Sequence, residues 1–154
     1  MFRQMRRTRQ MMTPGECSKV LENGASGVLA LSGDDGYPYA VPLNYAYSGG
    51  KLLFHCAVQG HKLDAIERCD KASFCVVDFE KLAPEKVTTH YRSVIAFGRV
   101  RVLTDEAEKR QAIEELSDRF IPSRPSCLND LSAVAMLEMT IEHMTGKESM
   151  ALKN

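Results

Sequence analysis

The chain has 154 residues, of which 44% are hydrophobic and 26% charged, and its formal net charge is zero. This length and composition predict one globular domain, residues 1–154, with a core of its own. The balanced charge argues against a broad surface for nucleic acid or for an anionic membrane. No apolar run is long enough to span a bilayer, and the cysteine usage described below leads us to expect a cytoplasmic protein. The basic residues 1–12 predict an arm rather than a secretory signal, because no apolar region follows them.

The cysteines do not form a disulfide or zinc pattern. Their number is odd and no two have the CxxC spacing: Cys17, Cys56, Cys69, Cys75 and Cys127. We therefore expect reduced thiols, most of them small buried hydrophobes, and no metal site. A redox role remains an alternative for Cys56.

In chain order, the first predicted element is a short helix over residues 13–23. Thr13 is its expected cap, Pro14 fits its first turn and Gly24 its end. The apolar run GVLALS over residues 27–32 predicts a strand.

Residues 37–47, YPYAVPLNYAY, alternate with a period of two and predict a second strand. Pro42 cannot donate to a neighbouring strand, so we expect an edge position or a bulge there. Ser48, Gly49 and Gly50 predict a hairpin turn into a third strand over residues 51–57. A helix is then expected to begin after Gly60, since Leu63, Ile66 and Cys69 are spaced by three.

The remaining chain predicts three strands and one clear helix. Residues 72–79 and 90–103 are expected strands, the second bent at Gly98, with a charged loop over residues 80–89 between them. Residues 105–120 predict an amphipathic helix. A loop with Pro122, Pro125 and Asn129 leads to a last strand over residues 134–146. Six strands joined mostly by hairpins predict a mainly β (α+β) fold, a closed or nearly closed antiparallel barrel with peripheral helices.

The junction between the third strand and its helix combines three residue types that suit an anion. A helix start leaves backbone amides unpaired and carries partial positive charge. Gly60 permits a sharp turn close to a ligand, while Lys62 and His61 add positive charge. The pattern is therefore compatible with a phosphate site, although from the local sequence alone an ordinary loop with a solvated lysine is the favoured interpretation, because short motifs often occur by chance.

Six short motifs occur in an order that resembles the FMN-binding split-barrel proteins related to pyridoxamine 5'-phosphate oxidase, most closely their nitroimidazole-resistance branch. They are Arg6-Arg7, Gly27 to Ala30, Gly36 to Tyr39, Val41 to Tyr45, Phe54 to Ala57 and Gly60 to Lys62. This resemblance implies a six-stranded split barrel and a homodimer, with FMN held in the groove between the subunits.

The resemblance also implies which residues contact the flavin. The residues expected to bind the phosphate are Gly60, His61 and Lys62. Backbone of the second strand is expected to lie along the isoalloxazine ring, the end of the third strand to make ring or ribityl contacts, and the long strand to supply a polar contact. These positions are Val41, Pro42, Leu43, Asn44, His55, Cys56, Ala57 and Ser93. Among the tyrosines that could stack on a flavin, Tyr91 is favoured, because on a strand it shares the face of Ser93.

The implied function is an FMN-dependent oxidoreductase that passes electrons from a reduced nicotinamide to a small acceptor such as a nitroaromatic, a quinone or dioxygen. His55 is the candidate proton donor, and a packed histidine is its alternative role. The basic C-terminal residues with which the oxidases bind substrate have no clear match, so vitamin B6 oxidation is not expected. The alternatives are a haem- or flavin-binding sensor on the same barrel, with His55 or His143 as haem ligand, and a related barrel that binds a deazaflavin.

The arginines near the N-terminus form a basic cluster: Arg3, Arg6, Arg7 and Arg9. They belong either to a solvated arm or to one that reaches a partner subunit or the ligand phosphate.

Overall fold

The computed structural model describes residues 1–121 and 131–153. Cys127 and the loop expected around Pro122, Pro125 and Asn129 lie outside these residues. The strands are β1 (Ser26–Ser32), β2 (Pro38–Asn44), β3 (Ala46–Ser48), β4 (Lys51–Cys56), β5 (Lys71–Ala83), β6 (Thr88–Val102) and β7 (Ala135–Glu148). The α-helices are α1 (Pro14–Asn23), α2 (His61–Arg68) and α3 (Glu106–Phe120). Short 3-10 turns lie at Thr8–Gln10, Asp34–Gly36, Pro84–Lys86, Leu131–Ala133 and Met150–Leu152.

The strands form one antiparallel sheet in the order β2-β1-β5-β6-β7-β4-β3. The expected antiparallel split barrel with peripheral helices is confirmed in part, but the expectation of six strands was wrong and, in the part of the chain that the structure describes, the sheet is not closed. The sheet has seven strands, and among the described residues no pairing joins its two edge strands, β2 and β3. Pro42 lies on the edge strand β2, as predicted from its missing donor.

The extra strand arises because the alternating run over residues 37–47 breaks at Tyr45. The Tyr45 backbone N–H donates to the Ala25 carbonyl at 3.3 Å, and its hydroxyl donates to the Leu21 carbonyl at 2.8 Å. The side chain is fully buried, and this burial raises the pKa of Tyr45 to about 12. The ring is therefore held toward α1, and β2 ends before β3 begins.

The three predicted helices are confirmed, each with the start expected from its sequence. Thr13 and Glu16 form a reciprocal capping box at α1, and the Asp105 side chain accepts from the Glu108 amide at α3. Gly60 precedes α2. The predicted bend at Gly98 is also confirmed as an irregularity between β6 and β7, where a Cβ on this glycine would meet the Thr140 carbonyl oxygen.

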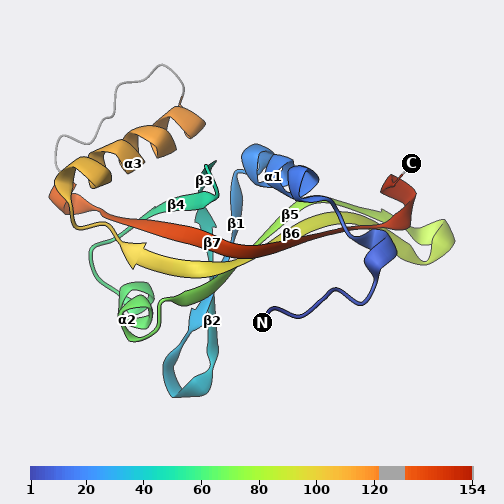
Figure 1. The fold of residues 1–154 in the computed structure, drawn as a ribbon, viewed down its shortest axis with the longest axis horizontal. Coiled ribbons are helices and arrows are strands. Elements are labelled where there is room, and N and C mark those ends of the chain that lie inside the picture. The colour runs from blue at the N-terminus through green and yellow to red at the C-terminus, as the bar shows by residue number, and fades with distance from the viewer. Residues whose placement is uncertain (122–130, 154) are drawn as a thin grey trace.

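The charged loop expected over residues 80–89 was wrong. Glu80 and Leu82 pair with Tyr91 and Thr89, so β5 and β6 continue as a hairpin that projects from one end of the sheet (Figure 1). Cross-strand pairing satisfies the backbone there in spite of the polar sequence. Only Pro84–Lys86 turns the chain, with Val87 at a φ of 49°.

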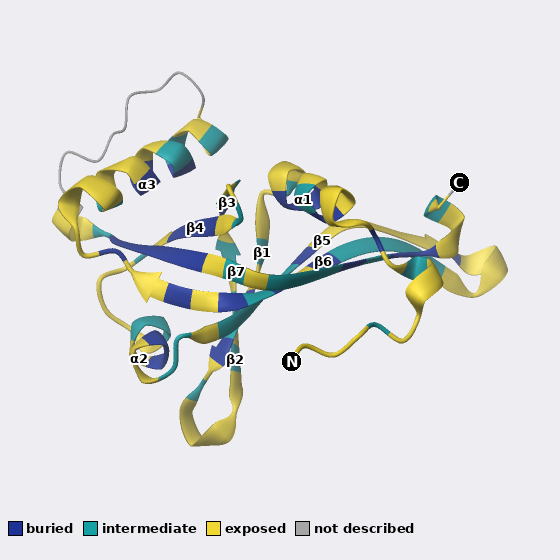
Figure 2. Ribbon diagram, viewed as in Figure 1, coloured by how far each residue is buried: buried dark blue, intermediate teal, exposed yellow. Residues whose placement is uncertain are grey.

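Helices α1 and α3 cover one side of the sheet, and α2 lies toward the other (Figure 1). The core has two parts. The larger packs α1 and α2 onto the central strands around Leu29, Phe54 and Phe74, and the smaller packs α3 onto β4 and β7 around Leu53 and Met136. Figure 2 shows buried residues along the middle of the strands, with exposed residues at the β5–β6 tip and along the N-terminal arm (residues 1–12). No helix in the described part of the chain is both long and apolar enough to cross a bilayer.

Candidate functional site

The start of α2 differs from an ordinary capped helix. Gly60, its N-cap, has a φ of 130° and a ψ of 169°, a conformation that residues with a Cβ rarely adopt. No side chain caps the helix, although the Gly60 carbonyl accepts from the Leu63 amide at 2.9 Å. The amides of His61 and Lys62 have no carbonyl one turn earlier in the helix, so this end presents free donors and partial positive charge.

These amides border a hollow of about 190 Å³ beside the end of β4. It is lined by Tyr39, Cys56, Ala57, Gln59, Gly60, His61, Lys62 and Leu63. Five predicted site residues therefore lie together: Cys56, Ala57, Gly60, His61 and Lys62. Within residues 1–121 and 131–153, the Lys62 ammonium makes no ion pair. Burial raises the pKa of the Cys56 thiol and the nearby Lys62 charge opposes that rise, which places the two groups in one electrostatic environment.

The His61 side chain is already engaged. Its ring stacks on Tyr39 with centroids 4.1 Å apart, and its Nε2 lies 3.4 Å from the Asp34 carboxylate. Arg68 also donates to Asp34, and this bond lowers the pKa of the carboxyl group. Sequence reasoning did not find Asp34, because no local pattern links the β1–β2 turn to the start of α2.

The four predicted residues on β2 lie on two faces of the sheet. Val41 and Leu43 are half-buried and pack against the larger core cluster. Pro42 and Asn44 are exposed on the opposite face, where Pro42 stands beside Val28 of β1.

Tyr91 and Ser93 lie far from the hollow within one chain. They share the outward face of β6 with Ile95, since strand side chains alternate. Lys71, which follows α2, pairs with Arg99 of β6. Ser93 lies six residues from Arg99 along this strand, which at the usual strand rise separates the two residues by roughly 20 Å. The ammonium of Lys147, opposite Ser93, lies over the Tyr91 ring at 5.3 Å.

His55 faces a different hollow from its neighbour Cys56. It is exposed at the end of β4 and lines an apolar hollow of about 190 Å³ beneath α3. The other lining residues are Ile113, Leu116, Ser117, Phe120, Ile121 and Met136. Among the described residues of this lining, His55 supplies the one imidazole.

Several other predictions are resolved by packing. Tyr45 is a buried core residue, and the Tyr47 hydroxyl lies 3.3 Å from that of Ser18. The four described cysteines are free thiols. Across residues 1–121 and 131–153, no group of three or more histidine, cysteine, aspartate or glutamate side chains is arranged to hold a metal ion.

Comparisons with known proteins identify the family. Residues 13–148 match the family model of pyridoxamine 5'-phosphate oxidase. A curated relative, an uncharacterised protein of Rhizobium meliloti, is 32% identical over 95 residues, which is 61% of this chain and 57% of that protein. The match thus spans less than two thirds of the relative's length.

Two solved structures have similar architecture. A proposed 5-nitroimidazole antibiotic resistance protein from Bacteroides thetaiotaomicron superposes with a TM-score of 0.79 at 20% identity, over 89% of this chain and 85% of that one. An FAD- and haem-binding protein from Mycobacterium smegmatis gives 0.78 at 25% identity, over 92% and 74%. The first likeness shows the fold alone. The motifs, the split-barrel architecture and the model match over most of the sequence agree, and the chain belongs to the pyridoxamine 5'-phosphate oxidase family.

Proposed function

We propose that this protein binds FMN and passes electrons from a reduced nicotinamide to a small acceptor. The observation that carries the proposal is the uncapped start of α2, where Lys62 without an ion-pair partner in the described chain borders a hollow. Family membership supports a flavin, and the Mycobacterium smegmatis neighbour is described as binding FAD and haem.

The residues at the α2 start fit a phosphate. Gly60 has open space where a Cβ would stand, so an anion can approach the backbone. Lys62 supplies a charge, and the amides of His61 and Lys62 supply donors. Because the His61 ring is held by Asp34 and Tyr39, we assign His61 a backbone contact only.

The separation of Tyr91 and Ser93 from the hollow supports a site shared by two copies of the chain. The outward face that they occupy carries apolar side chains in contact with solvent: Val28, Val77 and Ile95 are 40%, 59% and 39% exposed. Val28 and Ile95 both stand opposite Cys75, so the apolar residues are contiguous across three strands. Exposed apolar patches of this kind mark interfaces. In the proposed homodimer, this face meets the second copy and brings its Tyr91 and Ser93 toward the flavin.

FMN held by Gly60, His61 and Lys62 would supply the hydride-accepting and electron-donating chemistry. The chain binds the phosphate, orients the ring along β2 and excludes water between the subunits. His55 is the proposed proton donor to the acceptor.

The deciding experiment is the absorbance and mass of the chromophore of the purified protein. FMN gives paired bands in the blue and near ultraviolet, and light scattering should report a dimer. An intense Soret band would favour haem binding. A chromophore with the mass of a deazaflavin would show that the cofactor is a deazaflavin rather than FMN. A colourless protein that takes up none of the three would refute the proposal.

A second measurement separates binding from chemistry at His55. His55→Gln should retain bound flavin and slow reduction of the acceptor by about a hundredfold, the lower end of general-acid effects. An unchanged rate would assign His55 to packing.

A further inference from the structure

The N-terminal arm is fixed at both of its ends. The Phe2 ring stacks on His143 with centroids 4.6 Å apart and planes at 10°, and it lies 5.6 Å from Phe97. Met11 forms an antiparallel bridge with Lys147, and its carbonyl accepts from the ammonium of Lys153. The arm therefore lies along residues 143–147 of β7, beyond the part of this strand that β4 pairs, rather than extending into solvent.

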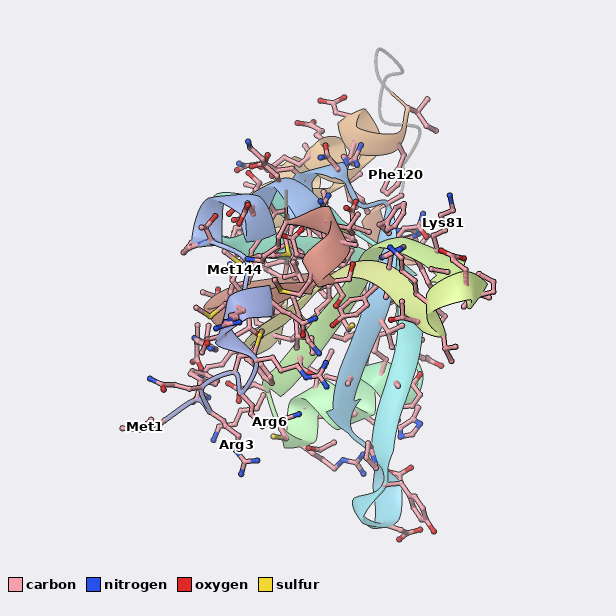
Figure 3. The ribbon with its side chains drawn as sticks, turned by 90° about the vertical axis from the view of Figure 1, so that its right-hand side faces the viewer. Met1, Arg3, Arg6, Lys81, Phe120 and Met144 are labelled. Carbon is pink, nitrogen blue, oxygen red and sulfur yellow. The ribbon has the colours of Figure 1, made fainter. Side chains whose placement is uncertain are left out.

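The middle of the arm must bow outward. Its anchors on β7, His143 and Lys147, lie roughly 13 Å apart at the usual strand rise. The chain from Phe2 to Met11 could reach about 30 Å if extended. The chain length beyond the distance between the anchors is taken up partly by the 3-10 turn Thr8–Gln10. The arginine side chains of this outward-bowed segment are exposed. Figure 3 shows Arg3 on the arm at the margin of the molecule and Arg6 further in.

The arginines of the arm differ from every other arginine that the structure describes. Arg68, Arg92, Arg99, Arg101 and Arg110 bond carboxylates, and Arg119 donates to the carbonyls of residues 23 and 24. Within the described chain, the guanidinium groups of the arm have no such partner: Arg3, Arg6, Arg7 and Arg9. The arm holds four of the 20 basic residues and none of the 20 acidic ones.

Fixing an arm costs conformational entropy, and here it holds four like charges near one another without a counter-charge. The arm also borders the outward face of β6 and β7. Phe97, which contacts Phe2, lies on the same face of β6 as Ser93 and Tyr91, because every second side chain of a strand points the same way. The Lys147 ammonium adds a further cation beside Tyr91. An anionic ligand bound at this margin would supply the counter-charge that the arm arginines lack.

We propose that the arm binds the phosphate groups of the reduced nicotinamide dinucleotide and selects the 2'-phosphorylated form, NADPH, over NADH. The inference deepens the proposed function and rests on its nicotinamide donor. Guanidinium groups bind phosphate oxygens through two parallel hydrogen bonds, and exposed arginines remain charged at every physiological pH. Arg6, Arg7 and Arg9 cluster within four positions, which suits a ligand that carries several phosphates.

The test replaces all four arm arginines by glutamine in the flavin-loaded protein. The KM for NADPH should rise at least about tenfold and the KM for NADH by a smaller factor, with kcat little changed, because NADPH loses its 2'-phosphate contact in addition to the pyrophosphate contact that both nucleotides share. The wild-type preference for NADPH should also weaken with added salt. The matched control removes the same charge elsewhere, at Lys19, Lys71, Lys86 and Arg110, and should leave the NADPH preference intact.

A binding titration makes the inference independent of turnover. Adenosine 2',5'-bisphosphate should bind the wild-type protein and the charge-matched control and lose at least about tenfold in affinity for the arm variant. Equal binding by all three proteins would overturn the inference, as would an arm variant that dissociates into monomers with its nucleotide preference unchanged. A wild-type protein without flavin would instead refute the proposed function, and the titration would still decide the role of the arm.

Discussion

The N-termini of α1 and α2 differ in one respect: the first is capped by side chains and the second is not. At α1, the Thr13 hydroxyl accepts from the Glu16 amide at 3.3 Å, and Glu16 accepts from the Thr13 amide at 2.6 Å. At α2, Gly60 offers no side chain and none caps the helix. The first helix caps the Glu16 amide with its own N-cap side chain, whereas the second has no side-chain cap for the amides of its first turn beside Lys62.

This difference separates a structural helix end from one that can receive a ligand. A capped start gains stability from its own side chains and has fewer donors left for an anion. An uncapped start gives up that stabilisation, and a phosphate can restore it on binding. Changes at α1 should therefore alter stability alone, whereas changes at α2 should alter flavin binding.

The largest expected effect is that of Gly60→Ala. A Cβ at a φ of 130° is strained by roughly 1–3 kcal/mol, so unfolding free energy and FMN affinity should both fall. The matched change at α1 is Gly15→Ala, where a Cβ meets nothing within 4 Å. That variant should be up to about 1 kcal/mol more stable, because alanine favours a helix. Urea unfolding and flavin titration measure both. If the two alanines behaved alike, the special backbone of α2 would have no role.

Lys62→Ala should weaken FMN binding by about tenfold, close to 1.4 kcal/mol, because one charge-assisted contact to the phosphate is lost. Lys19→Ala on the exposed surface of α1 is its control and should leave the affinity unchanged. Fluorescence quenching of added FMN gives both dissociation constants. Equal affinities in the two variants would show that the start of α2 does not bind the FMN phosphate.

Thr13→Ala should lower the free energy of unfolding by about 1 kcal/mol through loss of the α1 cap. Its FMN affinity should match that of the wild type, since this helix end is closed by its own side chains. Chemical denaturation and the same flavin titration test the two statements separately. A loss of flavin affinity here would contradict the division between the helix starts.

The smallest expected effect is the pH dependence of the α1 cap. Hydrogen bonds from the Thr13 backbone and hydroxyl lower the pKa of Glu16 in the folded state from its ordinary 4.5. The resulting stabilisation is present above that ordinary value and is lost as pH falls through the lowered pKa. The stability difference between wild type and Glu16→Gln should therefore shrink on acidification. A difference that stayed constant from pH 6 to pH 2 would exclude a role for the carboxylate charge.

The sequence by itself determined the elements whose signals are local. Thr13 with Glu16, Gly60 and Asp105 mark the three helix starts, because caps and positive φ depend on a few neighbouring residues. The missing donor of Pro42 likewise placed its strand at an edge. The ordered motifs also indicated the family, and the residues around the α2 start do lie in one hollow.

Only the tertiary structure decided the rest. Alternation continued through Tyr45, but its hydrogen bond to Leu21 on α1 ended the strand, and pairing with β6 made a hairpin of the expected loop. The engagement of His61 by Asp34, and the anchoring of the arm by Phe2, join segments 27 and more residues apart. Such contacts depend on strand order and on which faces meet, and neither is encoded in a short stretch of sequence.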